Sequence, residues 1–201
     1  MSMTIRMFSY KIVRDYGFAP NPFHGYCTLA TCKPQIRKHA KTGDLILGYG
    51  SKGMGHNEEL IYIMQVDEKI TYQQYWDDVR FYKKKPNLYS NKANAFGDNI
   101  YHQDEYNNWI QVDSHHSFED GVLNQDNLER DTSSLDVLIS QNFIYFGCDS
   151  IPSPTFEGVN ENAYPTGRGY RVNFSQPLIN NMSHWLLNHP NKGYVGRPIS
   201  W

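Results

Sequence analysis

The sequence predicts an α+β protein, in which a small, partly open mixed β-barrel is flanked by a few helices. Three observations lead to this prediction. Short strand-forming segments lead the chain, only three stretches have helical spacing, and no internal repeat or linker interrupts the 201 residues. We expect one domain over residues 1–201, because a chain of this length buries roughly 70% of the surface that its unfolded state exposes.

The predicted strands are short, and most alternate between apolar and polar residues. Residues 7–14 have the period of two that is typical of a strand. Residues 45–49 form an apolar strand after a Gly-Asp turn, and residues 60–68 return beside it after a glycine-rich connection. Later strands are predicted at 99–102, at 109–112, at 137–146 with an interruption near 140–142, and at 170–174.

Three helices are predicted, at residues 33–40, 72–82 and 177–187. Pro34 suits the first turn of the first helix, where its missing N–H is not needed. In the third helix, Leu178, Met182, Trp185 and Leu186 are spaced to face a core. Residues 87–133 are polar and poor in periodicity, so apart from the two short strands they are expected to be irregular.

Composition limits the classes of partner. The formal net charge is −2, which excludes the broad basic face of a dedicated duplex-DNA binder, whereas a small nucleotide needs only two or three cations. Aromatic residues make up 14% of the chain, and they either build the core or stack on planar ligands. No apolar run approaches the roughly 20 residues of a membrane helix, so we expect a cytoplasmic protein without a membrane partner. The oligomeric state stays open.

A set of short segments spread over nearly the whole chain carries a recognisable pattern. The segments are Tyr10, 14–23, 27–30, 32–37, 43–46, 48–51, 61–64, 100–102, 130–132, 137–140, 145–147, 167–170, and Gly196, Pro198 and Trp201. This set resembles the second nucleotide-modification-associated domain family. The resemblance implies a link to modification of DNA bases in phages and bacteria, and it brings no established catalytic residues to transfer.

A second resemblance concerns the fold. Residues 43–76 contain a Gly-Asp turn, an apolar strand, a Gly/Ser connection, a return strand and a Tyr/Trp-rich helix. This order is similar to that of pseudouridine-synthase-like (PUA-like) barrels. That group includes domains that read modified bases in an aromatic pocket.

Candidate ligand-binding residues fall in the loops and turns. Asp15 and Asn21 offer groups that read a base edge, or else they hold their loop through Asx-turns. Lys33 and Arg37 lie four apart on one helix face, so they either grip a phosphate or are simply solvated.

The glycine-flanked positions supply three more candidates. Tyr49 and Ser51 lie beside Gly48 and Gly50, where a ring can stack on a base, or the segment is only a flexible hairpin. Arg168 between two glycines fits an anion-binding turn or an ordinary one. We predict that Arg37 and Arg168 line one cleft, and that binding depends mainly on the Tyr49 ring and the Arg37 charge.

The chain also contains catalytic candidates. His116 could act as a general base that Asp131 orients. The alternative is that both residues belong to a solvated loop without a chemical role. Cys27 and Cys32 are five apart, with His24 and His39 nearby, which is looser than the usual spacing of zinc ligands. We therefore expect no metal and no other cofactor, while Cys27 remains a possible nucleophile.

Three functions fit these features. The first is a protein that binds a nucleotide, nucleobase or nucleic acid and acts in DNA base modification. The second is an enzyme that modifies a nucleobase or nucleotide, which needs a titratable pair such as His116 and Asp131 at the pocket. The third is sequestration of a signalling nucleotide in phage–host conflict, which needs affinity without turnover.

Overall fold

A computed structural model describes residues 4–201, which form two compact units. The first, here called the sheet unit, comprises residues 4–16, 40–67 and 140–201. The second, here called the network unit, comprises residues 17–39 and 68–139. Each unit is therefore assembled from segments that are far apart in the sequence.

The sheet unit is built on a seven-stranded sheet with the strand order β11-β1-β3-β4-β9-β12, in which β10 also pairs with β4. Its elements are β1 (Met7–Ile12), β3 (Leu45–Gly50), η1 (Lys52–Met54), β4 (Glu59–Gln65), β9 (Phe143–Tyr145), η4 (Gly147–Asp149), β10 (Ile151–Pro152), β11 (Tyr170–Arg171), α5 (Gln176–Asn188) and β12 (Gly193–Tyr194). Strands β1 and β3 are parallel, whereas β3 and β4 form the expected antiparallel hairpin.

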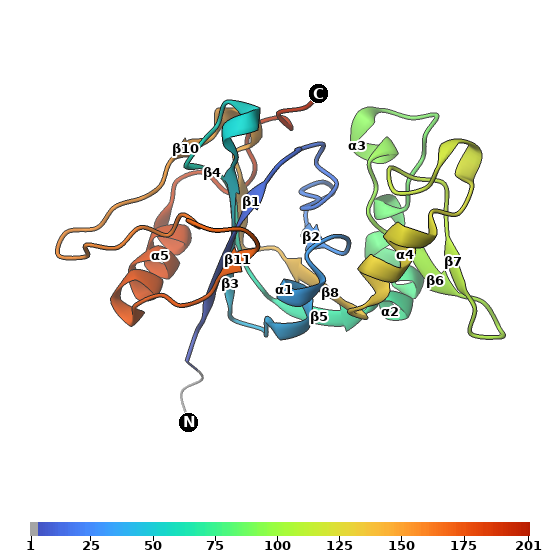
Figure 1. The fold of residues 1–201 in the computed structure, drawn as a ribbon, viewed down its shortest axis with the longest axis horizontal. Coiled ribbons are helices and arrows are strands. Elements are labelled where there is room, and N and C mark those ends of the chain that lie inside the picture. The colour runs from blue at the N-terminus through green and yellow to red at the C-terminus, as the bar shows by residue number, and fades with distance from the viewer. Residues whose placement is uncertain (1–3) are drawn as a thin grey trace. The chain divides into compact units, whose positions relative to one another are not determined.

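The core of the sheet unit is apolar. Helix α5 begins at the cap Ser175, whose hydroxyl accepts a hydrogen bond from the Leu178 amide. Its buried side chains Leu178, Met182 and Leu186 join Leu47 of β3 in one hydrophobic cluster. The helix therefore packs against the sheet through one apolar face (Figure 1).

The network unit consists of short elements around two small sheets, one with the order β2-β8-β5 and one formed by the β6–β7 hairpin. Its elements are β2 (Cys27–Leu29), α1 (Pro34–His39), β5 (Glu68–Thr71), α2 (Tyr72–Asp77), η2 (Val79–Lys84), α3 (Lys92–Ala95), β6 (Tyr101–Gln103), β7 (Trp109–Gln111), η3 (Glu119–Gly121), α4 (Gln125–Thr132) and β8 (Asp136–Ser140, its last residue outside the unit). Helix α2 lies beside the β6–β7 hairpin (Figure 1), and Trp76 stacks on His102 at 3.9 Å between ring centroids.

The α+β class is confirmed, but the barrel is not. The large sheet has two different end strands, β11 and β12, and no closed barrel forms within residues 4–201. The predicted strand at 137–146 divides into β8 and β9, which pair in different sheets. The PUA-like resemblance is therefore not confirmed. Among residues 4–201, no helix has the length and apolar character needed to cross a membrane.

Two of the three predicted helices are confirmed, as α1 and α5. The helix predicted at 72–82 ends early, at Asp77. Asp78 adopts an extended conformation and its carboxylate accepts the Arg80 amide, so the chain continues as the 3₁₀ helix η2. The expectation of irregular structure in 87–133 is wrong for 92–95, which form α3, and for 125–132, which form the longer helix α4. Only Leu128 and Asp131 of that helix are buried, so its apolar periodicity is weak.

Candidate active site

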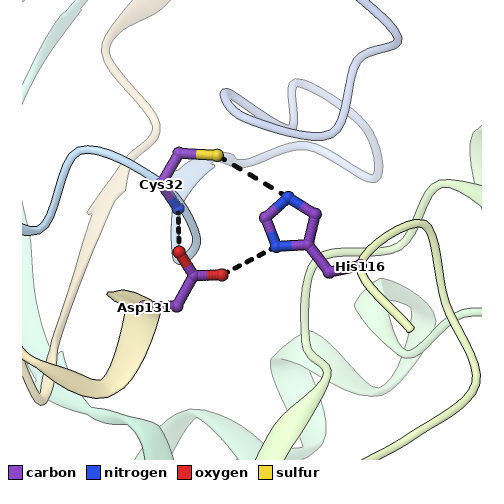
Figure 2. Close-up of side chains that lie close together, drawn as sticks. All are labelled: Cys32, His116 and Asp131. Carbon is purple, nitrogen blue, oxygen red and sulfur yellow. Dashed lines mark hydrogen bonds and ion pairs between the residues drawn. The ribbon is translucent and has the colours of Figure 1, made fainter. Parts of the chain in front are cut away.

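Three side chains from separate parts of the network unit converge on one point (Figure 2). Cys32 lies in the turn between β2 and α1, His116 in the turn after β7, and Asp131 in the last turn of α4. The hydrophobic strand β2 ends just before the turn, and Pro34 starts the next helix, so Cys32 stands where the chain changes direction.

The three groups form a hydrogen-bonded chain. The Sγ atom of Cys32 lies 3.7 Å from Nε2 of His116, and Nδ1 of His116 lies 2.7 Å from Oδ2 of Asp131 (Figure 2). The other carboxylate oxygen, Oδ1, accepts the backbone N–H of Cys32 at 2.9 Å. This is the arrangement of nucleophile, base and orienting acid found in triad enzymes.

The backbone at the cysteine is constrained. Cys32 and the following Lys33 both have positive φ, of 56° and 40°, in the left-handed region that side chains other than glycine seldom adopt. Such conformations cost of order 1–3 kcal/mol and persist where the surroundings hold them. The Asp131 carboxylate helps to fix this conformation, because it accepts a hydrogen bond from the Cys32 amide.

Arg37 also fixes the backbone at Cys32. Its guanidinium is fully buried and donates to four backbone carbonyl oxygens. Nε binds the Cys32 carbonyl at 2.8 Å, and one terminal nitrogen binds the Asp131 carbonyl at 2.6 Å. The other terminal nitrogen binds the carbonyls of Ser134 and Asp136. Arg37 therefore connects the backbones that carry the two ends of the triad, and the structure gives this predicted phosphate ligand a positioning role.

Asp131 remains ionised although it is completely buried. Burial opposes its charge, but the hydrogen bond and charge of His116 and the bond from the Cys32 amide together lower its pKa. The Tyr101 hydroxyl donates to Oδ2 at 3.0 Å, and the Arg130 side chain lies 3.6 Å from Oδ1. The carboxylate is thus held by donors on both oxygens.

His116 is protonated at neutral pH in this setting. Burial by itself lowers its pKa, but the hydrogen bond to Asp131 and the interaction with Cys32 raise it to about 9. The Phe18 ring packs against the imidazole with centroids 4.6 Å apart. The His116 carbonyl accepts the Asn127 side-chain amide at 2.9 Å and the Gln111 amide at 3.3 Å, so both ring and backbone are fixed.

Access to the site decreases along the chain of hydrogen bonds. The Cys32 side chain is half-buried, the His116 side chain is 11% exposed and that of Asp131 is not exposed. Cys32 is therefore the most exposed of the three residues. By contrast, Cys27 on β2 is fully buried, and burial raises the pKa of its thiol, which argues against Cys27 as the nucleophile.

The same three side chains offer one sulfur, one nitrogen and one oxygen ligand atom within 4.8 Å of one another. This donor set suits zinc, which takes three protein ligands and a fourth, exchangeable position in catalytic sites. The prediction that the protein binds no metal can therefore be tested at this cluster of Cys32, His116 and Asp131.

Two further predicted ligand residues lie in the network unit. Asn21 is buried, and its side chain donates to the Phe96 carbonyl and accepts from Lys84, so it holds the loop rather than facing a ligand. Lys33 is half-buried directly after Cys32. Burial lowers its pKa, while the charge of Cys32 has the opposite effect.

The other predicted ligand residues lie in the sheet unit. Tyr49 is fully buried, its hydroxyl pairs with Ser153 at 2.8 Å, and its ring packs edge-on against Tyr164. No face of this ring is exposed to stack on a base. Asp15 is buried and accepts the Tyr145 hydroxyl and the amide of Ile199. It thereby ties the C-terminal segment to the sheet.

Ser51 and Arg168 lie nearer the surface of the sheet unit. Ser51 precedes η1, and its carbonyl accepts the Met54 amide. Arg168 is exposed and lines a shallow cavity. Arg37 and Arg168 belong to different units, so their shared cleft stays a prediction.

Sequence reasoning selected His116 and Asp131 but missed Cys32 as their third member. It also missed Tyr101, which lies on β6. A usable signal was present in the turn Thr31-Cys32-Lys33-Pro34, since a cysteine between a strand and a helix-starting proline is well placed for a nucleophile. The chain order Cys, His, Asp is a further signal, although many proteins contain it by chance.

The family comparison agrees with the sequence resemblance. The family model described as nucleotide modification associated domain 2 matches residues 4–201. The chain belongs to this family. The match spans both units, and the family's description associates its members with modification of nucleotides. No curated protein and no solved structure matches the chain significantly.

Proposed function

We propose that the protein is an enzyme that uses Cys32 as a nucleophile toward an acyl group attached to a nucleotide or nucleobase. The observation that carries the proposal is the hydrogen-bonded chain from Cys32 through His116 to Asp131. Family membership supplies the nucleotide context. The reaction class is transfer or hydrolysis of an amide or ester.

In the first step, Sγ of Cys32 attacks the carbonyl carbon and forms a carbon–sulfur bond. The thiol proton, held by Nε2 of His116, passes to the leaving amine or alcohol as the old bond breaks. In the second step, water or an acceptor amine attacks the thioester. His116 takes the proton of this attacking group, and the Cys32 thiolate leaves, so the starting state is restored.

The electrostatics suit this chemistry. The raised pKa of His116 keeps a proton on the imidazole at neutral pH, and Nε2 lies 3.7 Å from Sγ, where it can pass this proton to the leaving group at the attacked carbonyl. Asp131 fixes the ring orientation through Nδ1, as the acid of a triad does.

The oxyanion of the intermediate needs a donor other than the Cys32 amide. In many enzymes the backbone N–H of the nucleophilic residue donates to the oxyanion, but here the Cys32 N–H donates to the Asp131 carboxylate. The half-buried ammonium of Lys33 is adjacent in the chain and interacts electrostatically with Cys32. Lys33 therefore takes the role of stabilising the negative charge in this proposal.

The chain contains its own controls for a test of thiol activation. Cys148 is half-buried like Cys32, but its thiol donates to the Asp149 carboxylate at 3.7 Å, whereas the Cys32 thiol lies beside the His116 imidazole. Iodoacetamide labelling near neutral pH, followed by peptide mass spectrometry, compares the two thiols in one sample. We expect Cys32 to react at least tenfold faster than Cys148, and Cys27 to be unreactive while the protein is folded.

His116→Gln should remove most of the difference between the two thiols, while Cys148 should react as before. Incubation with p-nitrophenyl acetate should add one acetyl group to Cys32, and Cys32→Ser should prevent rapid acetylation. Equal reactivity of Cys32 and Cys148, or labelling that ignores His116→Gln, contradicts the proposal.

An experiment with Zn²⁺ and a chelator distinguishes a nucleophilic Cys32 from a metal site formed by the same three side chains. If Cys32 is a nucleophile, a chelator leaves acetylation unchanged and added Zn²⁺ blocks labelling, because the ion occupies the thiolate. Acetylation that requires Zn²⁺ instead assigns the cluster to a metal and rejects the covalent route.

Turnover distinguishes this enzyme from the sequestration of a signalling nucleotide. Release of the acetyl group from Cys32, with regeneration of the thiol, is expected for an enzyme. An acetyl group that persists as long as the folded protein does contradicts catalytic turnover with this ester.

A further inference from the structure

The network unit contains a strongly basic, aromatic segment that the triad does not use. Residues 79–97 contain Arg80, Lys83, Lys84, Lys85 and Lys92 and no aspartate or glutamate, although the whole chain has a net charge of −2. A local cluster of cations with interleaved aromatic rings is the composition of a nucleotide or single-strand binding surface.

The structure divides these cations by role. Arg80 pairs with Glu68 and Asp78, and Lys84 is completely buried. Because Lys84 turns into the unit, its neighbours are left at the surface, with Lys83 exposed and Lys85 half-buried.

Lys83 and Lys85 line a cavity of about 680 Å³. Its volume falls within the roughly 300–1,000 Å³ of typical small-ligand sites. The aromatic residues on its wall are Tyr82 and Tyr89, together with the imidazole of His24. Burial and the charges of Lys84 and Lys83 lower the pKa of His24. One acidic residue, Asp113, also lines the cavity.

The two tyrosines are unusually exposed for large aromatic side chains. Tyr82 is 70% exposed and Tyr89 is completely exposed. The backbone that carries Tyr89 forms a turn, in which the Asn87 side chain accepts the Tyr89 amide at 3.1 Å. Asn91 caps the short helix α3 just beyond it. The rings are thus presented to solvent from defined turns.

Lys85 is held in place by aromatic contacts. Its ammonium lies 3.6 Å from the centre of the Trp76 ring and 5.6 Å from that of Tyr82. A phosphate approaching Lys85 therefore comes close to the Tyr82 ring, where a base can stack. This combination of π-face and cation matches the two halves of a nucleotide.

We propose that this cavity binds a nucleotide unit, with the base stacked on Tyr82 or Tyr89 and the phosphate held by Lys83 and Lys85. The unit is either a free nucleotide or part of a single strand, because both present the same base and phosphate. The site does not depend on the covalent chemistry proposed for Cys32.

The test uses the full chain and two probes, a fluorescein-labelled oligothymidylate followed by anisotropy and thymidine monophosphate followed by calorimetry. Tyr89→Ala and the double change Lys83→Ala with Lys85→Ala should each weaken binding about tenfold, while Tyr89→Phe retains it. With two lysines involved, the logarithm of the affinity for the strand should fall with the logarithm of salt concentration at a slope of about −1.4.

Matched controls lie elsewhere in the same unit. Tyr106 is 76% exposed and Lys38 is exposed, and neither lines the cavity, so Tyr106→Ala and Lys38→Ala should bind like the unmodified chain. Binding of thymidine monophosphate identifies a free-nucleotide site, and binding of the oligonucleotide alone identifies a strand site. Both outcomes support the proposal if they depend on Tyr89 and the two lysines.

The proposal is overturned if neither probe binds, or if the cavity variants bind like the two controls while their circular dichroism spectra stay unchanged. Cys32→Ser should leave binding intact. A failure of the cavity is thereby distinguishable from a failure of the thiol chemistry.

Discussion

The two units stabilise themselves in different ways. The sheet unit buries a continuous apolar cluster between its strands and α5, and its buried charged residues are Asp15 and Asp44. The network unit buries Arg37, Lys84, Asp98, His116 and Asp131. Burying such charges is costly unless each is paired and hydrogen-bonded. The network unit therefore holds more charged groups in its interior than the sheet unit does, alongside buried apolar side chains such as Leu29, Phe81 and Val137.

The largest effect is expected from Lys84→Met in the network unit. The Lys84 ammonium donates to the Asn21 side chain at 2.7 Å and to the carbonyls of Asn21 and Tyr26, and it compensates the buried Asp98. Its loss removes the opposite charge near Asp98 and leaves the Asn21 and Tyr26 carbonyls without this donor, so the free energy of unfolding should fall by about 3–5 kcal/mol. Urea denaturation measures the loss. Hydrogen exchange should rise first in peptides of 17–39 and 68–139.

The neighbouring Lys83→Met is the control, because Lys83 is exposed, and it should change stability by less than about 0.5 kcal/mol. If Lys84→Met is as stable as this control, the buried network is not what stabilises the unit.

Leu47→Ala probes the sheet unit in the same assay. Leu47 is fully buried in the apolar cluster, and truncation should cost about 2–5 kcal/mol through lost burial and the remaining cavity. Leu187→Ala on α5 is the matched control, since that leucine is 59% exposed. Cys32 labelling should stay fast in the folded variant. Equal exchange in peptides of both units would instead mean that they unfold together, and the comparison would fail.

The pH dependence of stability should reveal the His116–Asp131 pair. The folded-state pKa of His116 is raised, since its bonds to Asp131 and Cys32 outweigh burial, to about 9. The unfolded value is about 6.5. A raised pKa contributes stability that is complete below the unfolded value and is lost as pH rises through the folded one. We expect a loss of at most about 3 kcal/mol between about pH 6.5 and pH 9.

Asp131 acts in the opposite direction, because its pKa is lowered by His116 against the effect of burial. Its contribution is present above about pH 4 and is lost on further acidification. Urea denaturation of His116→Gln should show a flatter profile above neutrality, whereas His184→Gln, at an exposed position of α5, should follow the unmodified chain. Identical profiles for all three proteins would contradict the assigned pairing.

The smallest effect is expected from Arg80→Ala. Arg80 bonds Glu68 and Asp78, but its side chain is 39% exposed, so solvent screens the pairs. Its removal should cost less than about 1 kcal/mol by urea denaturation, despite its several short contacts. If Arg80→Ala lowered the free energy of unfolding as much as Lys84→Met, the difference in exposure between Arg80 and Lys84 would not explain their contributions to stability.

The sequence determined the local features of this protein. Helix α5 follows from its apolar spacing and from Pro177 near its start, and the β3–β4 hairpin follows from two apolar runs around a glycine-rich connection. The α+β class and the family membership were also recognisable from residues alone. These features depend on neighbours in the chain, so short-range patterns record them.

Only the tertiary structure decided which residues meet and which are buried. Cys32 lies 84 positions from His116 and 99 from Asp131, and no spacing rule connects residues so far apart. The same holds for Arg37, a surface helix residue by its sequence, which is buried because four carbonyl groups from two segments converge on it. Tyr49 likewise became a core residue because its strand is central in the sheet. Burial and convergence depend on long-range packing, which the order of residue types does not record.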